Sequence, residues 1–209
     1  DPSLKAARLE RLNKFDKFTF KKVDICDKES LNQIFKNYSP QKVINLAAQP
    51  GVRYSLINPQ AYMNSNLVGF LNIIELCKDH EVEGLIYASS SSIYGGNDTI
   101  PFSIDHQAKK PLSLYGATKR SNELIAHAYS HIYGLHTTGL RYFTVYGPWY
   151  RPDMGIYIFI KNIIENKPIT VFNNGKMSRD FTFIDDIVSG TISALDQNFE
   201  YEIFNLGNN

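Results

Sequence analysis

Strand-like and helix-like segments alternate along this sequence, and the alternation limits the folds that the chain can adopt. Short apolar or alternating runs, typical of strands, lie at residues 18–23, 43–48, 85–88 and 137–142. Helical periodicity precedes or separates them, at residues 3–13, 27–38, 59–78 and 113–133. Strands joined by crossover helices form a parallel sheet with helices on both faces. The pattern therefore predicts an α/β fold with a Rossmann-like parallel sheet flanked by helices.

The character of the sequence changes at Gly147. Beyond it the elements become shorter, and Pro, Asn and Gly become more frequent. We therefore expect a main domain over residues 1–146 and part of a smaller, substrate-binding region over residues 147–209. Some segments of this second region are expected to return to the main sheet.

Composition and charge exclude several functions. Lys and Arg total 22 and Asp and Glu total 21, a formal net charge of +1, so no basic excess favours nucleic-acid binding. Cys26 and Cys77 are too few for a disulfide framework and too far apart for a metal site. Apolar runs are shorter than the roughly 20 residues of a membrane helix, and no signal peptide opens the chain. These features predict a cytoplasmic protein that binds neither nucleic acid nor membrane and holds no metal.

The residues that follow the predicted strands are the first candidates for a site, because ligands bind beyond the carboxyl ends of parallel strands. These strand exits are Asp24–Ile25, residues 47–49, the four serines at residues 89–92, and residues 141–144. A run of serines at a strand end is commonly a plain polar turn. A functional reading therefore needs further residues nearby.

A Tyr-x-x-x-Lys pattern supplies such residues. Its two side chains lie on one face of a helix, where the ammonium can lower the pKa of the phenol. With 13 Tyr and 15 Lys, about one match is expected by chance. Three occur, at residues 38–42, 115–119 and 157–161. Pro40 interrupts the first and the third encloses an apolar helical run, whereas Tyr115 and Lys119 begin a long helix after the serines. Spacing alone leaves an ordinary surface pair as an equal alternative.

The serines and the tyrosine together are more specific than either alone. Tyr115 lies 21 residues after Tyr94, which closes the segment Ile93-Tyr94-Gly95 behind the serines. A serine that hydrogen-bonds a substrate hydroxyl, beside an ionisable tyrosine, can move a proton while hydride leaves carbon.

At this point the sequence resembles the extended short-chain dehydrogenase/reductase family, and within it the nucleotide-sugar epimerases. Four segments in the family's order carry the resemblance: LIYASSSSIYGG from Leu85, PLSLYGATK from Pro111, LRYFTVYGPWYRPDM from Leu140 and VFNNGKMSRDFTFIDDI from Val171. The match runs from about the first residue to the last. It implies NAD as cofactor, a UDP-sugar as substrate, and a homodimer formed through the two long helices at residues 59–78 and 113–133.

The resemblance also implies roles for individual residues. The catalytic residues would be Ser90, Tyr115 and Lys119. The cofactor contacts would be Asp24, Ile25, Leu46, Ala47, Ala48, Ser65, Tyr115, Lys119 and Phe143. The substrate contacts would be Arg53, Ser91, Ser92, Thr144, Arg151 and Arg179. A surface ion pair with Asp180 is the alternative for Arg179, and a salt bridge with Asp153 is the alternative for Arg151.

The reaction is indicated by missing carboxylates. Relatives that eliminate water carry Asp-Glu after the strand-exit hydroxyl, and relatives that decarboxylate a uronic acid carry a Glu just before the Ile/Val-Tyr-Gly; here Ser91 and Ser92 stand at these positions. Reversible hydride transfer at one carbon then remains, which favours epimerisation. The segment GPWYRPDM is similar to that of UDP-glucuronate 4-epimerases, in which the residues equivalent to Arg151 and Thr144 hold the sugar carboxylate.

One motif of dinucleotide-binding sheets is absent. No G-x-G-x-x-G occurs in the sequence, although glycines are needed where backbone amides approach a pyrophosphate. The resemblance implies that residues 1–146 are a partial NAD-binding domain without its first βαβ unit, and that the chain is incomplete at both ends. Two alternatives stay open: an epimerase or reductase acting on another nucleotide sugar, and a fragment that keeps the fold without binding the cofactor.

Overall fold

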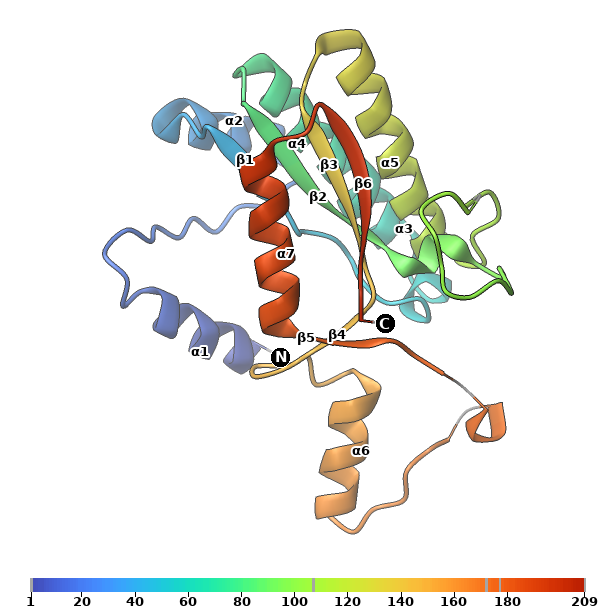
Figure 1. Cartoon of the computed structure of the whole chain (residues 1–209). Helices are drawn as coiled ribbons and strands as arrows, with labels where there is room; N and C mark the ends of the chain where they lie inside the picture. Colours follow the sequence, from blue (N-terminus) through green and yellow to red (C-terminus); the bar gives the residue numbers. More distant parts are fainter. Residues whose placement is uncertain (1, 107, 172, 177, 209) are drawn as a thin grey trace.

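A parallel sheet forms the centre of the molecule. The computed structural model describes residues 2–106, 108–171, 173–176 and 178–208, so that Phe172 and Met177 of the segment quoted from Val171 lie outside the described residues. Its main sheet has four parallel strands in the order β1-β2-β3-β6 (Figure 1). Their bounds are β1 (Lys42–Asn45), β2 (Gly84–Ser90), β3 (Thr137–Tyr142) and β6 (Tyr201–Leu206). The prediction of a Rossmann-like α/β fold is confirmed.

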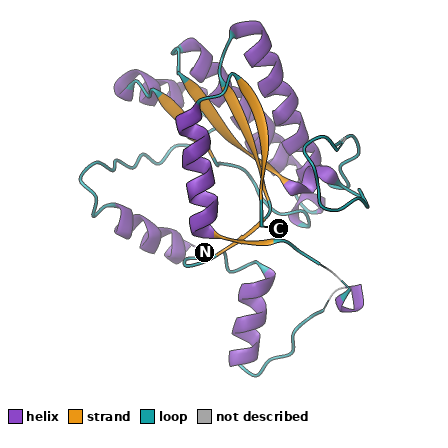
Figure 2. Ribbon diagram, viewed as in Figure 1, coloured by secondary structure: helices purple, strands orange, loops and turns teal. Residues whose placement is uncertain are grey.

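Helices cover both faces of this sheet (Figures 1 and 2). On one face lie α2 (Lys28–Tyr38), α4 (Gly69–Asp79) and α5 (Leu114–Tyr133), and on the other lies α7 (Ile184–Gln197). Successive residues of β2 separate the two cores: Leu85 and Tyr87 pack with the first group of helices, and Ile86 packs with α7. This alternation follows from the two-residue period of a strand. Because helices bury both faces of the sheet, the strands appear in the sequence as short apolar runs.

Local capping residues set the ends of the helices. The Asp27 side chain accepts a hydrogen bond of 3.1 Å from the Ser30 amide and begins α2. The Ser113 hydroxyl accepts one of 3.0 Å from the Gly116 amide and begins α5. Gly134, at φ 67°, ends α5 in the left-handed conformation that favours glycine. These caps agree with the helix bounds predicted from the sequence.

Residues 18–23 form no strand, so that prediction was wrong. A strand needs a neighbour that exchanges backbone hydrogen bonds with it. Among the described residues, β1 pairs with β2 alone, and no strand lies at its outer edge. The alternating pattern of residues 18–23 therefore remains without a partner, and this segment runs as a loop.

Two further elements differ from their predicted form. The strand predicted over residues 43–48 ends at Asn45, because the Asn45 side chain accepts a hydrogen bond of 3.2 Å from the Ala47 amide and turns the chain. The helix predicted over residues 59–78 is helical throughout, but its hydrogen-bonding pattern changes along its length. It consists of α3 (Pro59–Tyr62), a π-helical segment Met63–Val68, and α4.

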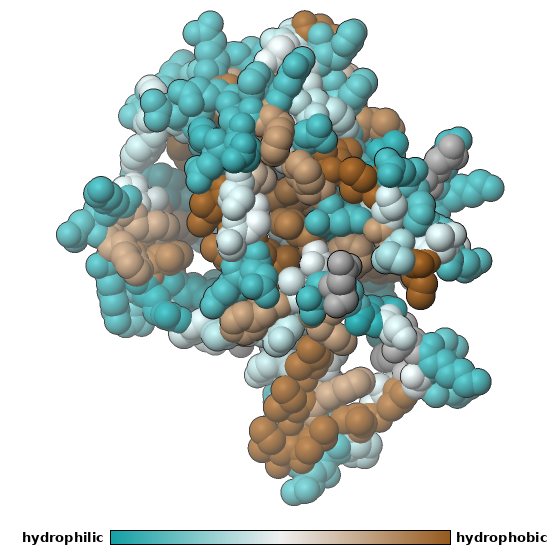
Figure 3. All heavy atoms as spheres, viewed as in Figure 1, coloured by the Kyte–Doolittle hydropathy of each residue, from teal (hydrophilic) through white to brown (hydrophobic). Residues whose placement is uncertain are grey.

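A second group of elements lies at the carboxyl end of the sheet. There β4 (Thr144–Tyr146) pairs in parallel with β5 (Phe181–Phe183), and α6 (Gly155–Ile164) projects from the body of the molecule (Figure 1). The surface of α6 is strongly apolar (Figure 3). The first helix, α1 (Pro2–Leu12), approaches this group from the other end of the chain. Among the described helices, none combines the length and apolar character needed to cross a membrane.

Candidate active site

Three predicted catalytic residues come together where β2 ends beside the first turns of α5. Ser90 is the last residue of β2, while Tyr115 and Lys119 lie one turn apart on α5. The side chain of Ser90 lies near enough to the Tyr115 phenol to act on its pKa, and the Lys119 Nζ lies 6.0 Å from the centroid of the Tyr115 ring. Lys119 is only 2% exposed, and its Nζ donates a hydrogen bond of 2.8 Å to the Ala88 carbonyl. The fold thus joins a hydroxyl, a phenol and an amine at one edge of the sheet.

Burial opposes charge on both Tyr115 and Lys119. It raises the pKa of the Tyr115 phenol above its ordinary value, although the neighbouring Ser90 side chain and the positive charge of Arg151 act in the opposite direction. It lowers the pKa of the Lys119 ammonium from 10.5 to about 8. Desolvation thus outweighs the favourable influence of Ser90 and Arg151 on the pKa of Tyr115. That Lys119 lowers this pKa stays a prediction.

Two residues that the sequence did not single out support the site. Tyr62, fully buried in α3, packs edge-on against the Tyr115 ring with 6.2 Å between centroids, and its hydroxyl donates to the Pro50 carbonyl at 2.8 Å. Asn66, in the π-helical segment, donates to the Thr118 hydroxyl at 3.0 Å. These contacts join the helical segment after β1 to α5. No sequence signal marks them, because a tyrosine and an asparagine are ordinary residues inside a helical pattern.

A buried ion-pair network lies beneath the catalytic residues and was also missed. Glu123, one turn beyond Lys119, is fully buried and accepts hydrogen bonds from Arg141 at 2.9 Å and from the Ser89 hydroxyl at 2.6 Å. Arg120 pairs with the second oxygen of Glu123 at 2.7 Å, and Arg141 donates to the Tyr94 hydroxyl at 2.9 Å. The network connects α5 to the ends of β2 and β3. Its only sequence signals are a Glu four residues after Lys119 and an Arg at a strand exit.

Only some of the predicted cofactor contacts follow the ends of strands. Leu46, Ala47 and Ala48 form the loop after β1, and Leu46 is 60% exposed. Ile25 packs so closely on α4 that a Cβ added to Gly69 would lie 2.5 Å from its Cδ1. The three others are placed separately: Asp24 is exposed and accepts from the Cys26 amide, Ser65 lies in the π-helical segment, and Phe143 follows β3.

The predicted substrate contacts divide into those near Tyr115 and those farther away. Ser91 and Ser92 form a short 3₁₀ helix after β2, in which the Ser92 amide donates to the Ser90 hydroxyl at 3.2 Å. Arg151 acts on Tyr115 through its charge and pairs with Asp153, which is the alternative stated for this arginine. Its contact with a sugar carboxylate stays a prediction. Thr144 lies in β4, where its amide donates to the Asp180 carbonyl.

Arg179 and Arg53 lie on the surface. The Arg179 guanidinium donates to the Ser178 carbonyl at 2.8 Å. The carboxylate of Asp180 instead accepts from the Thr182 hydroxyl and the Asn208 amide. Arg53 is exposed and precedes the short 3₁₀ helix Tyr54–Leu56.

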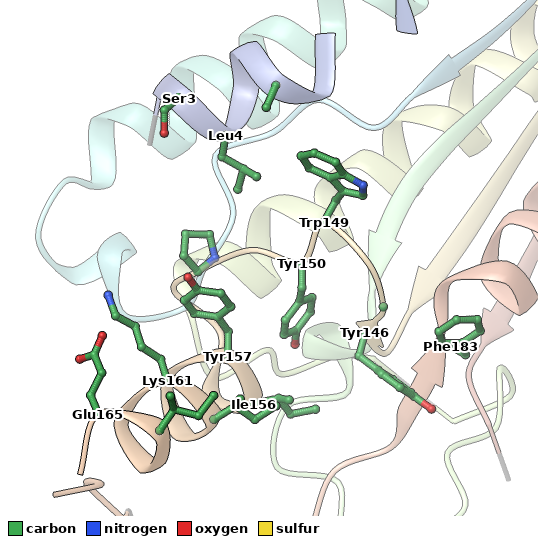
Figure 4. A pocket seen from close by; sticks show the side chains of 15 residues that line it. Ser3, Leu4, Tyr146, Trp149, Tyr150, Ile156, Tyr157, Lys161, Glu165 and Phe183 are labelled. Atoms are coloured by element: carbon green, nitrogen blue, oxygen red, sulfur yellow. The ribbon is translucent and has the colours of Figure 1, made fainter. Parts of the chain in front are cut away.

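Two pockets lie beside the loop that follows β4. The larger, of about 1010 Å³, is bounded by α1, this loop and α6 (Figure 4) and is lined by none of the three catalytic candidates. The smaller, of about 290 Å³, is lined by Phe143 and Arg151 among others. None of Ser90, Tyr115 and Lys119 lines the smaller pocket either, but it combines a predicted cofactor contact with a predicted substrate contact.

The residues present fit a ribose of NAD but not its pyrophosphate. An ammonium has three donors. Among the described residues, the Lys119 Nζ donates one hydrogen bond, to the Ala88 carbonyl. Two donors therefore remain for a diol such as a ribose. A loop of glycines for the pyrophosphate does not occur in this sequence. Within the described part of the chain, no cluster of His, Cys, Asp or Glu is suited to a metal ion.

A parallel sheet that carries Ser90, Tyr115 and Lys119 in this arrangement defines the short-chain dehydrogenase/reductase class of proteins. The chain belongs to the NAD dependent epimerase/dehydratase family, which matches residues 3–207. The family resemblance predicted from the sequence is thereby confirmed.

Several relatives are similar over nearly the whole chain. It is 51% identical to the UDP-glucuronate 4-epimerase of Thermodesulfobacterium geofontis, over 99% of this chain and 64% of that protein. The fold matches the UDP-glucuronic acid 4-epimerase of Bacillus cereus, solved with UDP-glucuronic acid and NAD, with a TM-score of 0.92 and 37% identity over 100% of this chain and 66% of that one. The UDP-glucose 4-epimerase of Thermus thermophilus, solved with NAD, matches with a TM-score of 0.86 and 30% identity over 93% of this chain and 65% of that one. The chain thus spans only about two thirds of the length of these relatives.

Proposed function

We propose that the protein is an NAD-dependent epimerase that inverts C4 of a UDP-sugar, with UDP-glucuronate as substrate and UDP-galacturonate as product. The observation that carries this proposal is the grouping of Ser90, at the end of β2, with Tyr115 and Lys119 on α5, where the Lys119 Nζ lies 6.0 Å from the Tyr115 ring and donates to the Ala88 carbonyl of β2. Ser90 and the positive charge of Arg151 both act on the Tyr115 phenol. Relatives named UDP-glucuronate 4-epimerases support the choice of substrate.

In this proposal, Tyr115 takes the proton of the sugar C4 hydroxyl and Ser90 orients that hydroxyl. Bound NAD⁺ supplies the acceptor and donor of hydride, together with a positive charge beside the phenol. Lys119 holds the ribose through its two remaining donors and favours the phenolate. The sugar passes through a 4-keto form, turns over in the site, and regains its proton from Tyr115 after hydride returns to the opposite face.

The remaining predicted contacts take roles along the two ligands. Asp24, Ile25, Leu46, Ala47, Ala48, Ser65 and Phe143 contact the cofactor, while Arg53, Ser91, Ser92 and Arg179 contact the UDP-sugar. Residues 1–146 would then be the cofactor side and residues 147–209 the substrate side. The exit loops of adjacent parallel strands support this arrangement, since they share one edge of the sheet.

A uronic acid makes a particular demand on the site. Its 4-keto form is a β-keto acid, which loses CO₂ readily, so the carboxylate must be held where decarboxylation is disfavoured. We assign this task to Arg151 and Thr144. The guanidinium of Arg151 already binds a carboxylate, that of Asp153, through two nitrogens, which is the geometry a sugar carboxylate requires.

Calorimetry on the 209-residue chain tests the proposal, first with NAD⁺ and then with UDP-glucuronate or UDP-glucose. We expect micromolar binding of NAD⁺ and tighter binding of UDP-glucuronate than of UDP-glucose. Equal binding of the two sugars would favour an epimerase or reductase acting on another nucleotide sugar. Absence of NAD⁺ binding would overturn the assignment for this chain and favour a protein that keeps the fold without the cofactor.

We also propose that the protein is a cytoplasmic homodimer. The two long helical segments expose apolar side chains: Met63, Val68 and Leu71 on the first, and Leu124 and Ile132 on α5. Such residues suit a four-helix interface between two copies. Sedimentation velocity should give a dimer that Leu124→Glu dissociates and the loop variant Leu112→Glu does not. Both cysteines are unpaired, which suits a reducing compartment.

A further inference from the structure

Helix α1 contacts a single tryptophan far along the chain. The Arg8 guanidinium donates a hydrogen bond to the Trp149 carbonyl, across 141 positions of sequence. The Arg11 guanidinium lies over the Trp149 ring, 4.8 Å from its centroid. Arg8 and Arg11 are three residues apart and therefore lie on the same face of α1. One helix face thus contacts both the backbone and the ring of one residue.

Trp149 lies in the loop that carries Arg151. This loop, residues 147–154, joins β4 to α6, and it contains the ion pair of Arg151 with Asp153. Trp149 has a φ of 64°, a left-handed conformation that is unfavourable for a bulky side chain. Such a conformation persists only when surrounding contacts hold it. The two arginines of α1 are contacts of this kind.

The same face of α1 also forms walls of both pockets. Leu4 and Ala7 line the larger pocket with Trp149 (Figure 4), and Arg8 lines the smaller pocket with Trp149 and Arg151. None of the described residues of α1 is buried in a core, and residues 13–27 join it to α2 without a helix or strand. The position of α1 therefore depends on its contacts with the loop and α6, rather than on the main sheet.

We propose that α1 is a positioning element for substrate recognition: Arg8 and Arg11 hold Trp149 and thereby fix the loop that presents Arg151 to the substrate carboxylate. We call these two contacts with Trp149 the α1 clamp. The inference rests on the proposed function in that Arg151 recognises a uronate. The position of Arg151 also matters to the phenol, since its charge lowers the pKa of Tyr115. Arg8 and Arg11 are positioning residues, because they act through Trp149.

The chain offers a direct probe, because Trp149 is its only tryptophan. Acrylamide quenching of its fluorescence should rise about twofold or more in R8Q/R11Q, since the ring loses its cationic neighbour. The matched control is K5Q/K14Q, which removes two positive charges from the same segment and should leave quenching unchanged. The single variant Arg11→Lys keeps both Arg8 and a cation over the ring. Its Trp149 should therefore be nearly as protected from quenching as in the wild type. Unchanged quenching in R8Q/R11Q would overturn the clamp whatever the substrate is.

Ligand binding tests the consequence for recognition. In R8Q/R11Q we expect the affinity for UDP-glucuronate to fall roughly tenfold, as a displaced arginine loses its bidentate geometry, while that for UDP-glucose stays constant. An equal loss for both sugars, or no loss, would overturn the link between the clamp and Arg151. If wild-type protein shows no preference for UDP-glucuronate, the proposed function fails, and quenching still decides whether α1 holds Trp149.

Discussion

The Nζ of Lys119 donates a hydrogen bond of 2.8 Å to the carbonyl of Ala88, two residues before Ser90 in β2. This contact fastens the first turns of α5 to the end of the strand that carries the serine. It keeps an amine with 2% exposure beside the Tyr115 ring, where its charge can act on the phenol. The same burial makes the ammonium costly, so Lys119 has consequences for both chemistry and stability.

Replacing Lys119 with Met should change how stability depends on pH. The ammonium has a pKa of about 8 in the folded chain, against an ordinary value of 10.5. Between these values the unfolded state binds more protons, so the stability of the wild type rises with pH; below the folded pKa the penalty of burial is complete. From about pH 7 to about pH 9.5 the free energy of unfolding of the wild type should gain about 2 kcal/mol relative to Lys119→Met. Urea unfolding at both pH values measures this difference, and parallel pH dependences would contradict it.

Tyr115→Phe should abolish the proton transfer while leaving ligand binding intact. We expect kcat for UDP-glucuronate epimerisation to fall by about 10²–10⁴, the usual contribution of a general acid or base. The dissociation constant for NAD⁺, measured by calorimetry, should change little. Tyr38→Phe is the matched control, since Tyr38 begins another Tyr-x-x-x-Lys pattern but is exposed at the end of α2. Equal effects of the two changes would remove Tyr115 from the mechanism.

Arg151→Ala should release the carboxylate of the 4-keto sugar and so permit loss of CO₂. We expect a higher KM for UDP-glucuronate and the appearance of a UDP-pentose, detected by mass spectrometry of the products. Asp153→Asn is the companion variant, because it removes the present partner of Arg151 and keeps the arginine. It should form no pentose. Epimerisation by Arg151→Ala without pentose formation and with an unchanged KM would contradict the assignment of Arg151 to the sugar carboxylate.

Glu123→Gln should destabilise the chain more than an ordinary surface change. It leaves Arg141, buried beside it, without its ion-pair partner, and breaking one side of a buried pair costs about 3–5 kcal/mol. The exposed Glu200→Gln should change the free energy of unfolding by less than about 0.5 kcal/mol. Urea denaturation compares the two variants with the wild type. A loss for Glu123→Gln no larger than for Glu200→Gln would show that the network contributes no net stability.

Local signals predicted much of the fold. The strand over residues 137–142 and the helix that Ser113 begins and Gly134 ends appear where the sequence indicated, because caps and periodicity act over a few residues. The strand predicted at residues 18–23 failed for the opposite reason. Its alternation was real, but a strand depends on a neighbour, and no local pattern says whether one is present.

The candidate site shows the same division. Ser90, Tyr115 and Lys119 were predictable, because their residue types and order along the chain carry the family resemblance. Tyr62, Asn66 and Glu123 were not, because a buried contact between residues more than 30 positions apart leaves no periodic trace.

The sequence by itself determined the parallel α/β class, the ends of its main helices, and which serine ends a strand and which tyrosine and lysine begin the long helix after it. The tertiary structure decided how these residues meet and what their surroundings do to their charges. Burial is a property of the packed chain, so only the structure reveals that Lys119 loses much of its preference for the charged form. Only the packed chain, likewise, brings Arg8 to Trp149, because contacts between distant parts of a sequence are formed by the fold that lies between them.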